Sequence, residues 1–537
     1  MKFSKQLILL CFFSFTLFGC KSIGGIPKET EPLDYKDSDV IQNEKNRIIS
    51  LLETSPIEAF WRSLLLGDES SISDCVTVIN TQISNAVESK NYFEAGRFLK
   101  VLETAGYKNE QISYSEAFNL FSRDLPGAVS DTDKLPSSIS DCVKATVTVL
   151  VDKGIKIQNG SGYVEKVIGS GFFIDKRGYI VTNYHVISDM VDSKYEGYSR
   201  LYVKLTEDDD EKTPAKVIGY DPVLDLALIK TELIPEYVLS LGSSNDLKVG
   251  DKINVIGAPL GLEGSMSAGI VSSTDRKIFT LGSVFQIDAP VNGGNSGGPC
   301  IDQNLKVQAI VFAGVAQAQG LNFAIPIEYL KQELPYLYHG GEVKHSWIGA
   351  YGHTKKNGNK RVGVDVQYVT PGSSAMLSGL KPGDVIYQLD DKKISSIENL
   401  QEFFRENTPN SIIKCYYRTE DDEDKCVLIY VGERPEKPAV EIYNSDLVGN
   451  SFLPLFGMEL VRSSTESRKI YKIENIISGS IADENGFSVN DSVTIRKVSF
   501  DDENEYIVAQ IETNRKKKSF LDLMMVLGTP YDNINYF

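Results

Sequence analysis

The stretch that decides the fold is Gly293-Gly294-Asn295-Ser296-Gly297-Gly298-Pro299, in which one serine stands among four glycines. A serine hydroxyl is a weak nucleophile, so a catalytic serine needs a base and backbone N–H groups that bind the oxyanion. Gly294 has no Cβ, so its N–H can point to the same place as that of Ser296. We predict an oxyanion hole from Gly294, Asn295 and Ser296, and expect Gly297 and Gly298 to leave room for a substrate backbone. A glycine-rich turn of a β protein is the alternative interpretation.

A histidine that can serve as the base lies upstream of this serine. Val181-Thr182-Asn183-Tyr184-His185 follows an apolar, strand-like run and a polar turn, which places His185 at the end of a strand. The chain has four histidines. His339, His345 and His353 come after Ser296, near or beyond the end of the predicted catalytic region. We therefore predict His185 as the general base.

The third member of a triad is a carboxylate that orients the imidazole and offsets its charge. Asp225-Leu226-Ala227-Leu228-Ile229-Lys230 offers an aspartate next to a buried strand. Asp221 competes for the role from four residues upstream. Asp221-Pro222 is typical of a turn and lacks the adjoining apolar run. We predict Asp225.

These motifs, in the order His, Asp, Ser, resemble the HtrA/Deg family of serine proteases. The segments that carry the resemblance are residues 169–174, 181–187, 225–230, 293–299 and 322–326. The resemblance implies an all-β, chymotrypsin-like double barrel over residues 139–340. It also implies peptide-bond hydrolysis through an acyl-enzyme, with catalytic His185, Asp225 and Ser296 and with neither cofactor nor metal.

The primary specificity pocket is predicted from the same segments. Tryptic enzymes carry an acid six positions before the nucleophile, and Pro290 stands there in this chain. We therefore expect no preference for Lys or Arg, and the resemblance implies small or medium apolar residues. Pro290, Leu321, Asn322 and Phe323 are the predicted lining residues. Asn322 takes a place where relatives often have glycine, so we expect a narrower or more polar pocket.

Length and charge limit the function classes. A chain of 537 residues is too long for one hydrophobic core and implies several domains. Its net charge of -17 argues against nucleic-acid binding, which requires a basic face.

The N-terminus is typical of an export signal. Lys2 and Lys5 precede an apolar stretch over residues 7–18 that is too short to span a bilayer. It ends in Leu17-Phe18-Gly19-Cys20, which resembles a bacterial lipobox. We predict a signal peptide over residues 1–19, lipidation of Cys20 and a flexible tether over residues 20–43, with the mature protein anchored to a membrane through its lipid. An ordinary signal peptide with an incidental cysteine is the alternative.

A helical domain is predicted over residues 44–124, followed by a linker over residues 125–138. Ser55 and Glu58 form a capping-box pattern, with Pro56 at the first helical position. Further helices are expected over residues 72–88 and from residue 92 to near residue 106. The segment over residues 86–102 resembles a TPR-type hairpin, and a plain helical bundle is the alternative.

After the protease region, residues 343–435 resemble a PDZ domain. Trp347, Ile348, Gly349 and Ala350 resemble the loop whose N–H groups form a nest for a C-terminal carboxylate. Ser395 and Glu398 are predicted to cap a helix that forms the other wall of the peptide groove.

An internal repeat predicts a second, diverged PDZ-like module over residues 450–537. Gly372, Ser373, Ala375, Gly379 and Asp384 recur 107 positions later in the sequence. Its candidate carboxylate loop is Leu455-Phe456-Gly457-Met458. Peptide binding and a purely structural role are both open for this copy.

Two cysteines, Cys415 and Cys426, flank a polar turn at nearly symmetric distances. They either form a disulfide across a β-hairpin or remain as reduced residues.

The predicted function is that of a membrane-anchored envelope endopeptidase that removes misfolded or mislocalised polypeptides. PDZ recognition of substrate C-termini and assembly into trimers or larger oligomers are implied by the resemblance. A regulatory protease with one signalling substrate is an alternative. So is a scaffold or chaperone lipoprotein whose PDZ and helical modules bind partners.

Overall fold

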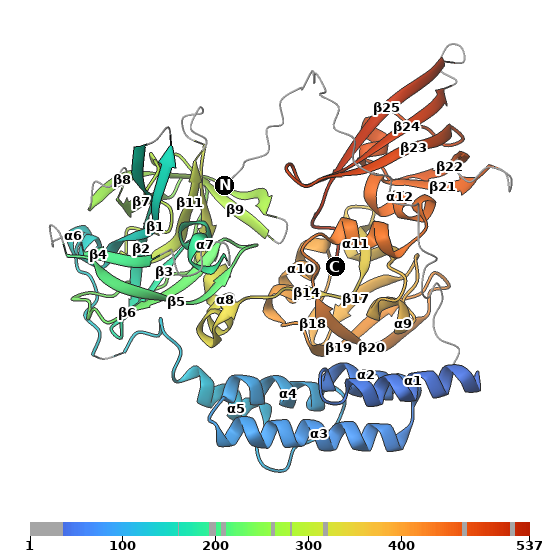
Figure 1. The fold of residues 1–537 in the computed structure, drawn as a ribbon, viewed down its shortest axis with the longest axis horizontal. Helices are drawn as coiled ribbons and strands as arrows, with labels where there is room; N and C mark the ends of the chain where they lie inside the picture. The colour runs from blue at the N-terminus through green and yellow to red at the C-terminus, as the bar shows by residue number, and fades with distance from the viewer. Residues whose placement is uncertain are drawn as a thin grey trace. The chain divides into compact units, whose positions relative to one another are not determined.

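The computed structural model describes residues 36–130, 132–158, 161–192, 200–205, 211–258, 264–279, 282–314, 321–463, 470–515 and 521–537 (Figure 1). The predicted signal peptide and Cys20 lie outside these residues. In this part of the chain, no helix is long and apolar enough to cross a membrane. The chain forms two compact units. One contains the described residues up to Asn85, Arg97–Asn109 and His345–Phe537, and the other contains Ala86–Gly96 and Glu110–Lys344.

The second unit is built from two antiparallel β-barrels, as the sequence predicts. The first barrel closes where β5 pairs with both β4 and β6, and β13 adds a short parallel edge. Its strands are β1 Thr146–Gln158, β2 Ser161–Asp175, β3 Tyr179–Thr182, β4 Arg200–Leu205, β5 Thr213–Asp221, β6 Leu226–Thr231 and β13 Gly341–Glu342. The second barrel is closed in the order β10-β11-β12-β9-β8-β7. Its strands are β7 Lys252–Gly257, β8 Ser265–Phe279, β9 Gly282–Ile287, β10 Pro299–Ile301, β11 Val307–Gly314 and β12 Asn322–Pro326.

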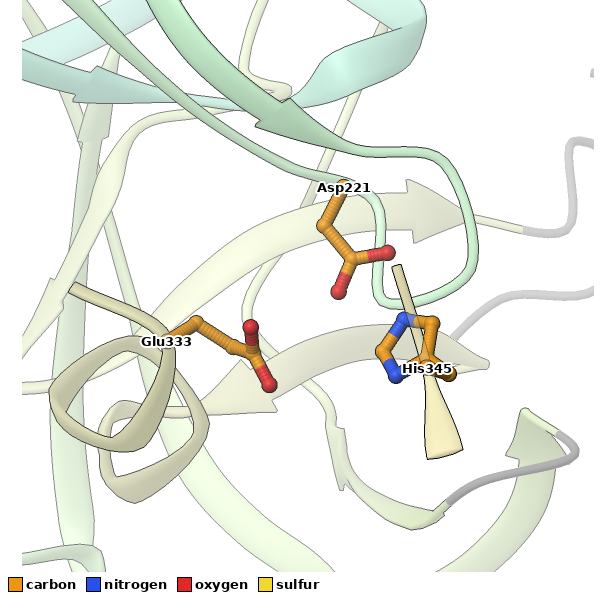
Figure 2. Close-up of side chains that lie close together, drawn as sticks. All are labelled: Asp221, Glu333 and His345. Atoms are coloured by element: carbon orange, nitrogen blue, oxygen red, sulfur yellow. The ribbon is translucent and has the colours of Figure 1, made fainter. Parts of the chain in front are cut away.

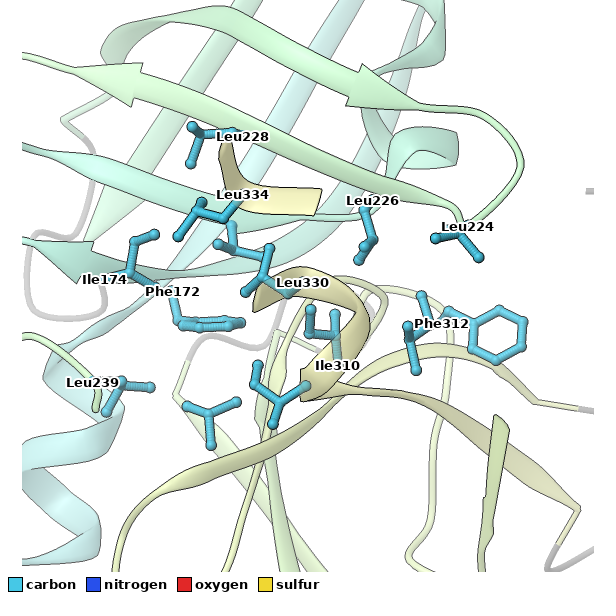
Figure 3. Packing of buried hydrophobic residues seen from close by; sticks show 14 of the residues in the cluster. Phe172, Ile174, Leu224, Leu226, Leu228, Leu239, Ile310, Phe312, Leu330 and Leu334 are labelled. Carbon is cyan, nitrogen blue, oxygen red and sulfur yellow. The ribbon is translucent and has the colours of Figure 1, made fainter. Parts of the chain in front are cut away.

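Apolar side chains from both barrels join in one core. Figure 3 shows Phe172 of β2, Leu226 of β6 and Ile310 of β11 around Leu330. Leu330 lies on α8 Ile327–His339, the helix that follows the last strand of the second barrel. The other helices of this unit are α5 Tyr114–Ser122, α6 Ile139–Lys144, α7 Tyr184–Val191 and the 3-10 turn η2 Ser244–Asp246. This shared core fixes how the two barrels meet.

The N-terminal helices are α1 Ser38–Leu51, α2 Pro56–Leu66, α3 Glu69–Glu88 and α4 Tyr92–Thr104. The predicted tether is too long by several residues, because α1 begins at Ser38, where the Asp37 side chain caps it. Ser55 is the N-cap residue of α2 and Pro56 begins the helix, as predicted, but the Ser55 side chain makes no capping bond. Trp61 of α2 donates from Nε1 to Leu428 O at 2.9 Å. The helical region therefore packs on the first PDZ module.

The first PDZ module contains a sheet in the order β14-β20-β19-β17-β16-β15. Its elements are β14 Ser346–Trp347, β15 Ala350–Asn357, β16 Lys360–Val369, α9 Ser374–Leu377, β17 Val385–Leu389, β18 Lys392–Lys393, α10 Ile397–Glu406, β19 Ser411–Arg418 and β20 Asp424–Glu433. Helix α10 carries buried Leu400, Phe403 and Phe404. Its cap is Ser396 rather than the predicted Ser395, because the Ser396 side chain accepts from Asn399 N.

The second module follows α11 Pro438–Ser445 and α12 Val448–Phe456. Its sheet runs β21-β22-β23-β24-β25. The elements are β21 Met458–Arg462, β22 Ile470–Ile476, α13 Ile481–Glu484, β23 Ser492–Asp501, β24 Tyr506–Arg515 and β25 Leu521–Pro530. Residues 502–505 join β23 to β24 directly, so no helix corresponds to α10 (Figure 1). Trp347, Tyr351 and Tyr368 of the first module share a hydrophobic cluster with the second.

The hairpin of β19 and β20 decides between the two interpretations of its cysteines. Cys415 pairs with Val427, and Cys426 pairs with Tyr416. Because paired positions on two strands share a face and neighbouring positions alternate, Cys415 and Cys426 point to opposite faces. Both thiols are free, with Cys415 buried and Cys426 exposed.

Candidate functional site

His185 and Asp225 meet at the ends of neighbouring strands. His185 follows β3 in the first turn of α7, and Asp225 directly precedes β6, which pairs with β3. The Asp225 carboxylate lies 2.7 Å from His185 Nδ1 and also accepts the His185 backbone N–H at 2.8 Å. Asp225 has a φ of +56°, an uncommon value for a residue other than glycine. This two-point contact fixes the orientation of the imidazole.

Asp221 is placed in a different environment. Its Oδ1 accepts the N–H groups of Val223 and Leu224, which forms the turn that the Asp-Pro pair predicts. Figure 2 shows its carboxyl group near that of Glu333 on α8, and both side chains are buried. The structure therefore brings Asp225, and not Asp221, to His185.

The nucleophile loop lies directly before β10. Ser296 Oγ donates to Phe312 O at 3.4 Å, and the structure shows no hydrogen bond between this hydroxyl and His185. Gly294 has a φ of +102°. The Asn295 N–H donates to Asn292 O at 3.1 Å. The predicted oxyanion hole requires this N–H to point to the substrate, so Asn295 does not contribute to it in this structure. The N–H groups of Gly294 and Ser296 remain as the candidate donors of the predicted set.

Gly297 and Gly298 have a different role from the expected one. A Cβ at Gly297 would lie 2.2 Å from Ser170 O, and a Cβ at Gly298 would lie 2.2 Å from Ile256 O. Both glycines therefore allow the loop to approach the protein's own strands rather than a substrate backbone. Gly297 N–H also donates to Val311 O at 2.8 Å.

Two buried polar residues that the sequence analysis gave no role hold the site together. Ser170 of β2 donates from Oγ to Gly294 O at 2.6 Å, and its own N–H donates to Ser296 O at 2.7 Å. Asn183 donates from Nδ2 to Asp225 O at 2.8 Å. The signal that could have revealed them is a polar side chain within an apolar strand or at its end, because buried polar groups need partners.

The predicted pocket residues come from two segments of the second barrel. Asn322 is buried and donates from Nδ2 to Ala289 O at 2.8 Å, which ties β12 to the residue before Pro290. Phe323 is buried beside Phe312, while Leu321 and Pro290 are exposed. The Asn322 amide is thus used to hold the segment that carries Pro290.

The predicted carboxylate loop of the first PDZ module has two N–H groups pointing to one acceptor. Gly349 N and Ala350 N donate to the same main-chain oxygen of Phe537, at 3.0 and 2.7 Å. Gly349 has a φ of +85°, and a Cβ there would lie 2.2 Å from Ser373 Cβ. Trp347 and Ile348 of the loop are buried. The loop therefore has the geometry of a nest for an anionic or carbonyl oxygen.

The corresponding loop of the second module is closed by its own helix. Gly457 is the C-cap of α12, with a φ of +76°, and its N–H donates to Leu453 O at 2.9 Å. Leu455 and Phe456 are buried in the core of this module. With this amide engaged and no second helical wall, the described residues of this module form no counterpart of the first groove.

Comparison with known proteins agrees with this architecture. A model for the trypsin-like peptidase domain matches residues 169–310, and a PDZ domain model matches residues 366–413. A model described as the TP0546 family PDZ domain matches residues 439–531, and a domain of unknown function (DUF8517) matches residues 39–121.

Among similar proteins is a probable periplasmic serine endoprotease DegP-like of Hahella chejuensis, which is 34% identical over 50% of this chain and 57% of its own. The serine protease PepD of Mycobacterium tuberculosis is 31% identical over 49% of this chain and 61% of its own. A solved structure, the HtrA-type protease AlgW with decapeptide, is 25% identical with a TM-score of 0.47, over 55% of this chain and 98% of that chain. The chain thus spans less than two thirds of the length of these two curated relatives.

The fold and the matched models define a trypsin-like peptidase domain followed by PDZ domains. Over these regions the chain is similar to serine proteases of the HtrA/Deg type.

Proposed function

We propose that the protein is a serine endopeptidase that cleaves polypeptides through an acyl-enzyme. The observation that carries the proposal is the contact between Asp225 and His185, which lies in a trypsin-like domain with Ser296 in the nucleophile loop. His185 takes the proton of Ser296 as the hydroxyl attacks the carbonyl, and later gives it to the leaving amine. Asp225 holds the imidazole tautomer.

The hydroxyl of Ser296 turns before it reacts. It donates to Phe312 O at 3.4 Å in this structure, and attack requires that it donate to His185 instead. The N–H groups of Gly294 and Ser296 then stabilise the oxyanion, where one donor is worth about 3 to 4 kcal/mol.

The substrates proposed are misfolded or mislocalised polypeptides with small or medium apolar residues before the cleaved bond. Pro290 replaces the acid of tryptic enzymes, which supports the proposal that Lys and Arg are disfavoured. The first PDZ module recognises substrate C-termini through the Gly349 and Ala350 amides. Related proteins are named periplasmic, which supports a place in the bacterial envelope.

Lipidation of Cys20 anchors this envelope protein to a membrane. Cys20→Ala removes the thiol that acylation and lipoprotein-type cleavage both need, so the variant should be soluble or retained uncleaved. Detergent partitioning measures this, and a processed variant that still partitions into detergent contradicts the anchor. Assembly into trimers or larger oligomers is proposed from the family, and light scattering of the purified protein tests it.

The decisive test of the activity is covalent labelling of Ser296 by a fluorophosphonate together with cleavage of casein. Ser296→Ala should lose both, because the remaining oxyanion donors alone do not hydrolyse peptides at a useful rate. Ser115→Ala, which removes an exposed serine of α5, is the matched control and should keep both. Labelling that persists in Ser296→Ala contradicts the assigned nucleophile.

The carboxylate assignment has its own test. Asp225→Asn should lower kcat by about 10⁴, since the amide favours the wrong tautomer of His185. Asp221→Asn keeps an oxygen that accepts from Val223 and Leu224, so its kcat should stay close to wild type. The reverse order of the two variants contradicts the choice of Asp225.

A further inference from the structure

The last residues of the sequence lie in the groove of the first PDZ module. Gly349 N and Ala350 N donate to Phe537 O, Phe537 N donates back to Ala350 O at 2.9 Å, and Gly352 N donates to Asn535 O at 3.1 Å. Tyr536 pairs with Tyr351 as an antiparallel bridge. This is the pattern of a peptide that adds a strand to the edge of a PDZ sheet.

The side chains of this segment are buried rather than laid on the surface. Phe537 is 0% exposed and belongs to the hydrophobic core of the first module, together with Ile348, Leu400 and Phe404. Tyr536 is also 0% exposed, and its hydroxyl donates to Pro454 O at 3.1 Å. The groove is thus filled at the position that takes the last side chain of a ligand.

Both sides of the groove hold the segment by its main chain. Gln401 of α10 donates from Nε2 to Ile534 O at 2.7 Å and to Tyr536 O at 3.0 Å. Arg434 donates to Tyr536 O at 2.8 Å and forms an ion pair with Asp532 at 2.5 Å. Because these contacts involve mostly backbone oxygens, they accept many sequences, and the buried Phe537 side chain supplies the selectivity.

The second module holds the start of this segment in place. Tyr531 follows β25, its N–H donates to Glu505 O, and its own carbonyl accepts from Ala439 N, both at 2.9 Å. Only residues 532–537 then lead from this fixed point into the groove.

We propose that residues 531–537 are an intramolecular ligand of the first PDZ module, and that a partner polypeptide with a bulky apolar C-terminal residue binds only by displacing them. The inference rests on the proposed recognition of C-termini by this groove. In this proposal, the second module holds the competing segment at the groove of the first module. Recognition is therefore gated by competition within the chain.

The expected size of the competition follows from the short tether. A ligand on a short linker has a millimolar effective concentration, so a segment with a Kd of about 10 μM weakens the apparent affinity for a free peptide roughly 100-fold. Removing the segment from the groove should raise the apparent affinity for a free peptide by the same factor.

The test is fluorescence anisotropy of a labelled peptide with the sequence of residues 531–537 and a free C-terminus. The full chain should bind it roughly 100-fold more weakly than Phe537→Asp, whose charged side chain cannot enter the apolar core. Val526→Asp is the matched control, because it places the same carboxylate at a site that is 66% exposed on β25. This control should bind as weakly as wild type.

The outcomes separate this inference from the proposed function. Equal affinity of wild type and Phe537→Asp means that the groove recognises C-termini but that residues 531–537 do not occupy it, and only the present inference falls. Binding by neither chain means that the groove is not a receptor for C-termini, and both fall.

A measurement on the unsubstituted chain guards against misfolding of the variant. Hydrogen exchange of the Phe537 amide, which donates to Ala350 O, makes this measurement. Exchange in the chain should be at least tenfold slower than in the free peptide. An excess of free-acid peptide should accelerate it more than the amidated peptide does. Exchange at the rate of the free peptide overturns the inference.

Discussion

The first and second PDZ modules share one glycine–serine contact and use the adjoining amide differently. Gly349 packs on Ser373 and Gly457 packs on Ser480, with the serine Cβ atoms 2.2 and 2.1 Å from where a glycine Cβ would lie. Gly349 N–H reaches Phe537, whereas Gly457 N–H closes α12. The first module also has α10 as a second wall, and the second joins β23 to β24 without a helix.

This difference teaches that the repeated core of a PDZ module does not by itself make a receptor. A groove needs a free nest and a second wall in addition to the sheet edge. The second module lacks both over its described residues, and residues 531–537 extend from its strand β25. The proposed division of labour is a receptor and a presenter of its ligand.

The largest effect is expected from Gly349→Ala and Gly457→Ala, compared as a pair. The left-handed backbone costs an alanine about 1 to 2 kcal/mol, and displacing the neighbouring serine adds about 1 to 3 kcal/mol. Each variant should lower the free energy of unfolding by a similar amount. Chemical denaturation followed by tryptophan fluorescence measures this change. The two tryptophans of the chain, Trp61 and Trp347, both lie in the unit that contains the PDZ modules, so the signal reports on that unit.

Peptide capture should separate the two variants. In a chain opened by Phe537→Asp, Gly349→Ala should abolish binding of the labelled peptide, and Gly457→Ala should leave it within a few fold. Equal loss of binding in both would break the comparison, because it would give the second loop a part in recognition.

A smaller effect is expected at Arg434. Its side chain is 4% exposed, its guanidinium pairs with Asp532, and its Cζ lies 5.3 Å from the centroid of the Trp347 ring. Arg434→Met should lower the free energy of unfolding by about 1.5 to 3 kcal/mol, the usual contribution of hydrogen bonds to charged groups. It should leave the affinity of the full chain for the labelled peptide within a few fold, since the peptide and residues 531–537 lose the same contacts to Arg434. In the chain opened by Phe537→Asp it should weaken peptide binding, and unchanged binding there would show that Arg434 does not hold a ligand in the groove.

The smallest effect concerns pH. Burial lowers the pKa of His353, four residues after Gly349, and Tyr351 Oη lies 2.7 Å from its Nε2. A histidine whose pKa is lower in the folded state than in the unfolded state binds its proton preferentially in the unfolded state. The free energy of unfolding therefore falls as the pH drops below the unfolded pKa near 6.5. The first module should therefore lose stability between pH 7 and pH 5, and His353→Gln should lose less.

In the second module, the residue four positions after Gly457 is Val461, which does not titrate. The pH dependence expected from His353 therefore has no equivalent at that position of the second module. Melting curves of wild type and His353→Gln at both pH values make the measurement. An identical pH dependence in the two proteins would contradict the role of His353.

The barrel fold and much of its site could be predicted because the motifs are short and ordered. His185, Asp225 and Ser296 each stand next to a strand that the local pattern reveals, and the order of the motifs indicates the fold. The hydrogen bond of Ser296 to Phe312 O could not be predicted, because it depends on a side-chain rotamer. Gly297 and Gly298 were misjudged because their neighbours, Ser170 and Ile256, come from distant strands.

The PDZ region shows the same limit more clearly. The repeat predicts two copies of a fold, but the contact of Phe537 with Gly349 joins the two ends of a long segment and has no local signal. The absence of a helix between β23 and β24 could not be predicted either, because helix and strand patterns are similar in short apolar runs.

The most direct test of the difference between the two modules is hydrogen exchange at their loops. The amides of Gly349, Ala350 and Gly352 should be protected in the full chain, and Phe537→Asp should make them exchange rapidly. The Gly457 amide should stay protected in both, because α12 supplies its acceptor. Rapid exchange at Gly349 and Ala350 in the unsubstituted chain would contradict the account, since it would show an empty groove with no ligand supplied by the second module.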